Sequence, residues 1–347
     1  MNIPENIESL PLFFILGRPR SGTTMLRSMF DAHPNVAIPP EFPVLASVIR
    51  LSQSKWEECT IDKFVSLAVS NRKFVNIGLT AEEIRSALAE KFSKHHSLDF
   101  QTAFRITNAL FVSSFEKKQM LAIGDKNPMY SLYTARLRKI FPDAKFIFLY
   151  RHLFSVVDSV YNTNFELHWP AVISWQWKKS FILARRDMQK HPQHSLKIKY
   201  EDLVANPANN LIELCQFIGI QFDEIMLKFN KKEQLSKTYG DKLQLAHASL
   251  LKDIHEVKLP EWKTADKTRY KVALAWAGKS FEQAGYERVP VKLKWIYWLR
   301  GLPYFLVFIA IKVFVGFMRF ITRKKFSGNI PMRLAGVLYG DMKNNSL

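Results

Sequence analysis

The sequence predicts an α/β fold: a P-loop-like, doubly wound parallel sheet flanked by helices, with a C-terminal amphipathic helical appendage. Short apolar runs alternate with helical segments, and the first run leads into a glycine loop of the phosphate-binding kind. The chain has 347 residues, of which 48% are hydrophobic, enough for one large core and an appendage. We expect one domain over residues 1–287 and a basic, hydrophobic tail over residues 288–347.

The first strand is expected at residues 12–16, LFFIL, and its helix at about residues 21–33, stopped by Pro34. Between them, Gly17 and Gly22 have the spacing of the P-loop motif G-x-x-x-x-G-K-[ST], although Thr23 stands where that motif has lysine. The apolar run is short and continues directly into the glycine loop. We therefore expect a buried strand here and no signal peptide.

The remaining elements alternate along the chain. Residues 47–118 are predicted to be helical, with Thr80 and Glu83 forming a capping box. The segment 145–151, KFIFLYR, is apolar up to its last residue, as expected of a central parallel strand buried on both faces. Further strands are expected at residues 120–124 and 196–200. Helices are expected at residues 131–144, 153–162, 171–190, 206–219 and 269–287. The helix at 206–219 has Asn206 as its cap, Pro207 in its first turn and Gly219 at its end.

The glycine loop suits an anion even without lysine, because backbone N–H groups at a helix N-terminus bind phosphate by themselves. Thr24 keeps the hydroxyl of the motif, and Arg20 supplies a cation earlier in the loop. The central strand is followed by Arg151, and no plausible Walker-B aspartate is found. The sequence therefore favours a nucleotide with a 5′-phosphate and no essential metal over a metal-dependent kinase.

Five motifs in a fixed order resemble one family. PRSGTT, DAHPNV, GDKNP, FPDAKFIFLYRHLFSVVDSVY and KYEDLV resemble the sulfotransferases that use 3′-phosphoadenosine 5′-phosphosulfate (PAPS), closest to the tyrosylprotein branch and its bacterial relatives. The resemblance covers residues 11–287. It implies PAPS as co-substrate, in-line transfer of a sulfuryl group to a hydroxyl acceptor without metal, and nucleotide binding by the loop residues Arg20, Ser21, Gly22, Thr23 and Thr24. No nucleic-acid partner is expected, because the basic charge is interleaved with long apolar runs and no nucleic-acid motif is present.

A second anion site is expected after the central strand. Arg151 lies at its carboxyl end, and Ser159 follows eight residues later in the next helix, so that a guanidinium and a hydroxyl could hold a phosphate group. The resemblance implies that they bind the 3′-phosphate of PAPS. The family usually has an acid–proline or acid–glycine pair after the arginine, whereas this chain has RHLF. The spacing of arginine and serine is retained, and the alternative is a surface arginine at a strand end.

The acceptor side needs a general base that takes the proton of the hydroxyl. Glu41, in PPEF, matches the catalytic glutamate of the tyrosylprotein branch. A solvated loop glutamate is the alternative interpretation. His33 is the competing base, although its place before Pro34 is more typical of a helix end.

Fixed cations are expected to stabilise the negative charge that develops on the leaving phosphate. Arg20 and Lys126 are the candidates, because Lys126 matches the family lysine that steadies the bridging oxygen. Tyr200 resembles the family tyrosine near the nucleotide, with a core aromatic as the alternative. Trp177 is expected in the core or beside the nucleotide.

The tail lies outside the resemblance. Of the net charge of +19, more than half lies in residues 288–347, which hold eleven Lys/Arg residues and a single acid, Asp341. Residues 302–321 include thirteen Leu, Ile, Val or Phe residues. Four residues fall on one stripe of this helix: Lys312, Gly316, Arg319 and Arg323.

An apolar helix with a narrow basic stripe is typical of membrane interfaces. We expect a cytoplasmic protein that is peripheral on the inner face of the membrane and associates with it through residues 293–326. Whether the helix spans the membrane or lies in its plane is left open. The alternative is a helical pair packed on the enzyme or in a homodimer. A glycan or glycolipid hydroxyl near the membrane is the favoured acceptor, and a peptide tyrosine remains open. The alternatives of another class are a P-loop kinase and a non-catalytic nucleotide-binding membrane protein.

Overall fold

The computed structural model describes most of the chain, and its residues form two compact units. The described residues are 3–42, 44–48, 51–52, 54, 56–71, 73–163, 166–240, 248–251, 267–287, 289 and 291–321. The first unit consists of Met1–Tyr150 and Leu183–Val257, and the second of Arg151–Ile182 and Lys258–Leu347.

The first unit is built on a five-stranded parallel sheet of order β2-β3-β1-β4-β5. The strands are β1 (Leu12–Leu16), β2 (Val36–Ala37), β3 (Ala122–Lys126), β4 (Lys145–Tyr150) and β5 (Ser195–Lys199). β1 lies between β3 and β4, and every neighbouring pair is parallel. The predicted α/β class with a doubly wound parallel sheet is confirmed.

Differences from the predicted elements are local. β3 starts and ends two residues later than expected, so that it ends at Lys126. β2 was not predicted, because its two residues lie in a segment that reads as loop and become a strand only by pairing Val36 with Ala122. The helical prediction is wrong for residues 110–118, since the last helix before β3 ends at Ala109.

Helices cover the sheet. Those of the first unit are α1 (Thr23–Ala32), α2 (Val44–Val48), α3 (Glu58–Val69), α4 (Ala81–His95), α5 (Phe100–Ala109), α6 (Thr134–Ile140), α9 (Tyr200–Ala205), α10 (Pro207–Ile218) and α11 (Lys232–Tyr239). The predicted capping box of Thr80 and Glu83 is present at the start of α4. α10 begins at Pro207 and ends before Gly219 as expected, but the Asn206 side chain makes no cap hydrogen bond.

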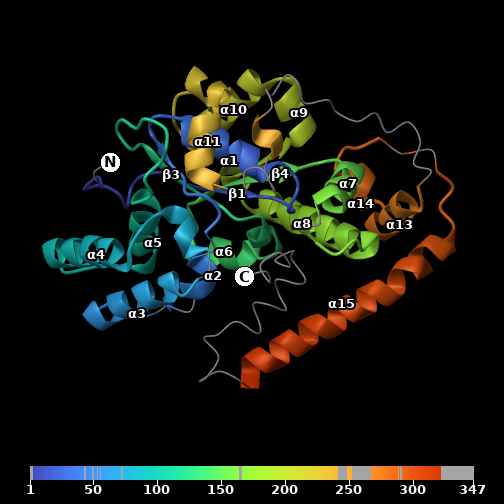
Figure 1. Cartoon of the computed structure of the whole chain (residues 1–347), viewed down its shortest axis with the longest axis horizontal. Coiled ribbons are helices and arrows are strands. Elements are labelled where there is room, and N and C mark those ends of the chain that lie inside the picture. The colour runs from blue at the N-terminus through green and yellow to red at the C-terminus, as the bar shows by residue number, and fades with distance from the viewer. Residues whose placement is uncertain are drawn as a thin grey trace. The chain divides into compact units, whose positions relative to one another are not determined.

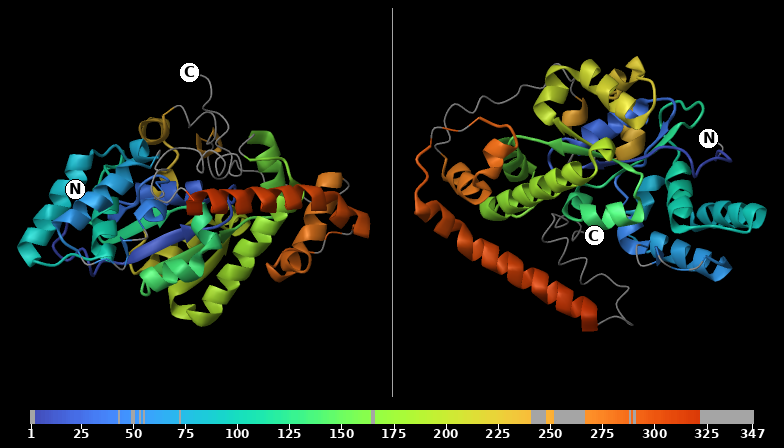
Figure 2. Two further views of the ribbon diagram at one scale, coloured as in Figure 1. Left: turned by 90° about the horizontal axis from the view of Figure 1, so that it is seen from below. Right: turned by 180° about the vertical axis from the view of Figure 1, so that it is seen from behind.

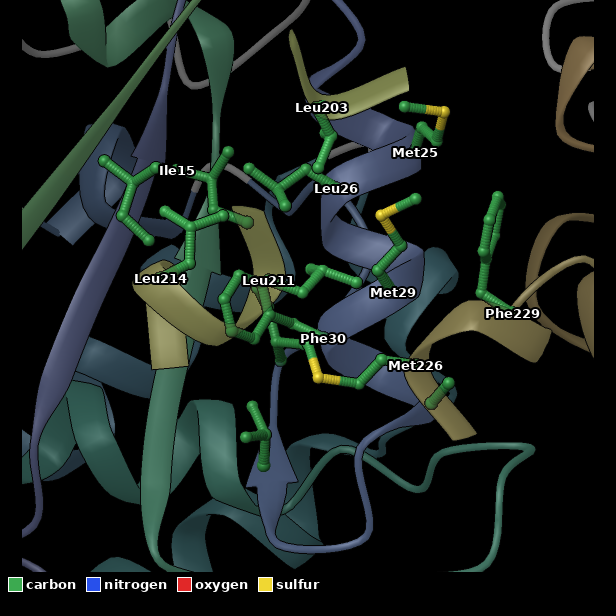
Figure 3. Close-up of a cluster of buried hydrophobic side chains, with 14 of the residues drawn as sticks. Ile15, Met25, Leu26, Met29, Phe30, Leu203, Leu211, Leu214, Met226 and Phe229 are labelled. Atoms are coloured by element: carbon green, nitrogen blue, oxygen red, sulfur yellow. The ribbon is translucent and has the colours of Figure 1, made fainter. Parts of the chain in front are cut away.

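The two faces of the sheet have different cores. On one face, α1 and α10 pack on β1 and β4 through aliphatic and methionine side chains, among them Ile15, Leu26, Met29 and Leu214 (Figure 3). On the other face the core is aromatic: the ring of Phe14 lies 5.9 Å from that of Phe104 on α5. Figure 1 shows α1 and α10 on one side of β1 and α5 on the other. β1 is therefore buried on both faces. The glycine loop that follows β1 thus starts from a strand that is packed on both sides.

The second unit is helical. It contains α7 (Leu153–Thr163), the start of α8 (Pro170–Lys190), α13 (Thr268–Ala277), α14 (Ser280–Gln283) and the long helix α15 (Trp295–Ile321, Figure 2). α15 packs on α13 where the indoles of Trp276 and Trp298 stack 5.4 Å apart. The close approach depends on Gly301, since a Cβ there would lie 2.3 Å from the Trp276 indole nitrogen.

α15 also contacts α8. The rings of Phe305 and Phe308 each lie 5.6 Å from that of Trp175. The Lys312 ammonium lies 5.7 Å from the centre of the Trp175 ring, so this lysine faces α8. Of the predicted basic stripe, Arg323 lies outside the described residues and the side chain of Arg319 is not described, so the stripe stays a prediction.

Many large apolar side chains of α15 are exposed. A 20-residue stretch, Trp295–Phe314, is long and apolar enough to cross a membrane by length and composition alone, and 11% of it is buried. The large hydrophobic side chains exposed on the helix are Trp295, Ile296, Trp298, Leu299, Tyr304, Leu306, Val307, Ile309, Val313, Phe314 and Phe317. We call this set the apolar face of α15.

Candidate active site

The glycine loop between β1 and α1 has the features of an anion site. Gly22 precedes α1 with φ at 92°, and no side chain caps the helix. Arg20 has φ at 74°, a conformation that non-glycine residues rarely adopt and that often marks a ligand-binding loop. The Ser21 hydroxyl is buried and has no hydrogen-bond partner among the described residues. The loop thus presents backbone N–H groups and a buried hydroxyl at a helix N-terminus.

The loop is held tightly by its neighbours. A Cβ on Gly17 would lie 2.5 Å from the Leu149 carbonyl oxygen of β4. A Cβ on Gly22 would lie 2.3 Å from Cδ2 of Tyr200, which is buried at the start of α9. Tyr200 therefore lies directly against the loop, and its place beside the nucleotide stays a prediction.

Glu41 and Lys126 form an ion pair beside the start of α1. Lys126 Nζ lies 3.2 Å from Glu41 Oε2 and 3.5 Å from the Thr24 hydroxyl. Only 3% of the Lys126 side chain is exposed, because the residue ends a strand inside the sheet. The structure thus brings together three predicted residues from three separate segments.

A second lysine, which the sequence did not indicate, contacts the same carboxylate. Lys73 Nζ lies 2.5 Å from Glu41 Oε1. No motif marks Lys73, and its position 32 residues after Glu41 gives no local signal. Both oxygens of the predicted base are therefore bound to ammonium groups.

These contacts set the charge of the site. Burial by itself would raise the pKa of Glu41, but the Lys73 and Lys126 ammonium groups outweigh it and hold the pKa well below its ordinary value. Burial raises the pKa of the neighbouring Asp125 to about 7, against the opposing effect of Lys126 and with the help of the Glu41 charge. The two ammonium groups thus favour the ionised form of Glu41, whereas burial favours the protonated form of Asp125.

The Glu41 loop is tied to α1 by a buried arginine. Arg27 Nη2 donates to the Ile38 carbonyl at 2.6 Å, and its Nε lies 3.2 Å from the Pro39 carbonyl. An ion pair with Asp31 at 3.2 Å balances its charge. The helix that carries the glycine loop thus also positions the segment before Glu41. The sequence signal for this role is weak: a charged residue on the apolar face of α1.

His33 is engaged by the backbone. Its Nδ1 accepts from the Asn35 N–H at 3.0 Å, so that Nε2 carries the proton and donates to the Gln221 carbonyl at 2.8 Å. Burial lowers its pKa. One ring nitrogen therefore binds the turn after α1 and the other binds the distant backbone at Gln221. His33 is also the C-cap of α1, which agrees with its interpretation as a helix-end residue.

Arg151 and Ser159 belong to the second unit. Arg151 follows the last residue of β4, and Ser159 lies on α7, which begins at Leu153. The Trp177 indole donates to the Arg151 carbonyl at 2.9 Å and is buried, which places Trp177 in the core. The joint role of Arg151 and Ser159 in a phosphate site stays a prediction.

A cavity of about 400 Å³ lies elsewhere in the first unit. Its lining is Ala32, Pro34, Phe115, Glu116, Lys118, Asp223, Ile225, Lys231 and Gln234. None of the predicted site residues lines it. Among the described residues there is also no group of three or more His, Cys, Asp or Glu side chains that could hold a metal ion.

The model of the Sulfotransferase family matches residues 11–224 of this chain. The chain belongs to the sulfotransferase family. It is 24% identical over 264 residues to the protein-tyrosine sulfotransferase of Drosophila melanogaster, covering 73% of this chain and 47% of that one. It is 26% identical to protein-tyrosine sulfotransferase 1 of Danio rerio over 263 residues, 74% of this chain and 66% of that one.

This sulfotransferase spans about half the length of the first curated relatives it matches. Among solved structures, the sulfotransferase domain from the Synechococcus PCC 7002 olefin synthase aligns with a TM-score of 0.50 at 24% identity, over 80% of this chain and 95% of that one. That likeness supports the fold. The family match contains every predicted site residue, whereas α15 lies outside it.

Proposed function

We propose that this sulfotransferase moves a sulfuryl group from PAPS to a hydroxyl acceptor, with Glu41 as general base. The observation that carries the proposal is the position of Lys126, whose ammonium lies within 3.5 Å of both Glu41 and the Thr24 hydroxyl. A cation between the anion loop and a carboxylate suits a reaction in which the leaving phosphate gains charge while the acceptor loses a proton.

The residues of the first unit fit the phosphosulfate end of PAPS. The glycine loop would hold the 5′-phosphate through its backbone N–H groups, the Ser21 hydroxyl and the Arg20 side chain. The buried Ser21 hydroxyl without a partner among the described residues supports this assignment. By resemblance to the family, Arg151 and Ser159 would hold the 3′-phosphate, and Tyr200 would lie beside the nucleotide.

The proposed step is a balanced in-line displacement. The acceptor oxygen forms a bond to sulfur while the bond between sulfur and the bridging oxygen breaks. The leaving 3′-phosphoadenosine 5′-phosphate (PAP) keeps that electron pair, and the hydroxyl proton goes to Glu41. Lys126 and Arg20 would stabilise the charge on the departing phosphate. No metal is required for this step, in keeping with the expectation from the sequence.

The acceptor is proposed to be a hydroxyl near a membrane, such as that of a glycan or glycolipid. The apolar face of α15 supports this choice, because an exposed surface of this kind is typical of membrane-associated helices. In this proposal residues 1–287 catalyse the reaction, and the tail over residues 288–347 attaches the protein to the membrane through residues 293–326. The cytoplasmic side of the membrane and a homodimer stay predictions.

A peptide tyrosine is the second candidate acceptor. The observation that favours it is the similarity to proteins named protein-tyrosine sulfotransferases. A kinase, or a nucleotide-binding protein without activity, would be the alternative if no sulfuryl transfer occurs.

The test is transfer of ³⁵S from labelled PAPS to whole-membrane extracts and to tyrosine peptides, with identification of the labelled product. We expect label in an acceptor, full activity in EDTA, and a loss of about 10²–10⁴-fold in Glu41→Gln with nucleotide affinity retained. Activity that survives Glu41→Gln but is lost in His33→Ala would make His33 the base. Absence of any transfer, together with metal-dependent ATP turnover, would favour the kinase.

A further inference from the structure

Lys73 sits in a turn that is built to place it beside Glu41. The turn joins α3 to a short 3-10 helix, Phe74–Ile77. Buried Asn71 closes it, accepting the Lys73 N–H on its side-chain oxygen at 3.0 Å and the Phe74 N–H on its carbonyl at 2.8 Å. The ring of Phe74 packs 5.8 Å from that of Phe42, the residue after Glu41. Both the ion pair and this ring contact join the two loops.

The two lysines on Glu41 differ in their surroundings. Lys126 is buried and also faces the Thr24 hydroxyl at the start of α1. Lys73 is 38% exposed and contacts the other oxygen, Oε1, in a carboxylate that is itself 29% exposed. Oε1 is therefore the oxygen on the open side of the pair, whereas Oε2 faces the loop.

A general base needs an oxygen in reach of the acceptor hydroxyl. In the structure Lys73 occupies Oε1 and Lys126 occupies Oε2. We propose that Lys73 is a positioning residue that holds the Glu41 carboxylate in a resting state and leaves Oε1 when the acceptor hydroxyl binds there. This inference rests on the proposed role of Glu41 as base.

The charges around Glu41 give the contact a chemical consequence. The titratable groups that act on it include the Lys73 and Lys126 ammonium groups, with Asp125 as a neighbouring acid. Lys73 lowers the pKa of Glu41 more than Lys126 does. Removing the Lys73 ammonium therefore raises the pKa of Glu41 and makes the carboxylate a stronger base. Lys73 thus keeps basicity low until the acceptor displaces it.

The first test measures the carboxyl group itself. Lys73→Met removes the ammonium and keeps most of the side chain, Lys73→Arg keeps the charge, and Lys94→Met is a matched control that breaks an exposed ion pair with Glu90 at 2.6 Å. Protein labelled with [5-¹³C]glutamate is titrated by NMR, and Glu41→Gln identifies the Glu41 signal. We expect the pKa of Glu41 to rise by about one unit in Lys73→Met and to stay at the wild-type value in Lys73→Arg and Lys94→Met.

The second test separates acceptor binding from chemistry. With whichever hydroxyl acceptor gives turnover, Lys73→Met should lower the acceptor KM about twofold to fivefold, since no partly exposed ion pair has to be broken, and leave PAP affinity unchanged. An unshifted Glu41 titration in Lys73→Met, or a raised acceptor KM, overturns the role of Lys73. Full activity in Glu41→Gln instead overturns the proposed base, so the two failures are distinguishable.

Discussion

The ring of Tyr200 lies against the backbone of Gly22. A Cβ on Gly22 would come within 2.3 Å of Cδ2 and 2.7 Å of Cε2 of that ring, and the glycine has φ at 92°. Two separate restrictions therefore exclude a side chain at this point of the loop. One is the left-handed backbone, and the other is the aromatic ring that packs on it.

The first prediction concerns this contact. Gly22→Ala should lower stability and abolish PAP binding, because the ring or the loop must move. Gly78 is the matched control, since it has φ at 66° but nothing within 4 Å of an added Cβ. Gly78→Ala should cost only the backbone term of about 1–2 kcal/mol. Thermal unfolding and calorimetry with PAP measure both effects.

The steric term can be isolated by a double variant. Gly22→Ala combined with Tyr200→Ser removes the clashing ring and should recover part of the stability lost in Gly22→Ala. Equal losses in Gly22→Ala and Gly78→Ala would contradict the packing argument.

The second prediction concerns Asp125, whose pKa is raised by burial to about 7. Its folded-state pKa lies above the unfolded value of about 4, so the folded state binds more protons between these two pH values and wild-type stability falls as pH rises through this window. Asp125→Asn cannot ionise. The free energy of unfolding of Asp125→Asn should therefore exceed that of wild type by an amount that grows from about pH 4 to about pH 7. Above that pH the difference should stay constant, at no more than about 4 kcal/mol.

Denaturant unfolding of wild type and Asp125→Asn from pH 5 to pH 9 checks this expectation. Asp62→Asn is the control, because its carboxylate is exposed in an ion pair with Arg85. A stability difference that does not change with pH would mean that Asp125 is not the titrating group.

The third prediction concerns the 3′-phosphate. If Arg151 and Ser159 read it, the protein should bind PAP much more tightly than AMP, and Arg151→Ala should weaken PAP binding by about tenfold to a hundredfold with little change for AMP. Ser159→Ala should have a smaller effect in the same direction. Calorimetry with both nucleotides measures the preference, with Arg136→Ala, at an exposed position of α6, as control. Equal affinity of wild type for PAP and AMP would refute the assignment.

The fourth prediction concerns the apolar face of α15. Exchanging Val313, Phe314 and Phe317 for asparagine removes three exposed side chains that make no ring contact with α8 or α13. Binding to liposomes that contain anionic lipid should fall strongly, while the unfolding temperature stays near that of wild type. Val112→Asn, at a side chain 78% exposed, is the matched control.

Salt dependence in the same flotation assay separates the orientations. An interfacial helix should be partly released by high salt, whereas a spanning helix should resist both salt and alkaline carbonate. Unchanged binding of the triple variant would remove this face from the attachment. Deleting α15 is a poorer test, because it uncovers Trp276 and Trp175.

The sequence by itself determined the features that depend on neighbouring residues. The apolar runs of β1 and β4, the glycine spacing of the loop and the capping box of Thr80 and Glu83 all follow from local pattern, and the structure has them where they were predicted. The order of motifs also identified the family, since a series of weak signals in one order is specific. Strands, turns and caps of this kind can be predicted from sequence because the residues that form each of them lie within a few positions of one another.

Only the tertiary structure decided the contacts around Glu41. Three of these contacts join residues that are not neighbours in the chain: β2 pairs with β3, Arg27 donates to the Ile38 carbonyl, and Lys73 forms an ion pair with Glu41. Their energies depend on burial and distance, which no local pattern encodes. A lysine on a surface turn and a lysine that sets the charge of a carboxylate have the same sequence signal, and they differ only in where the fold brings the ammonium group.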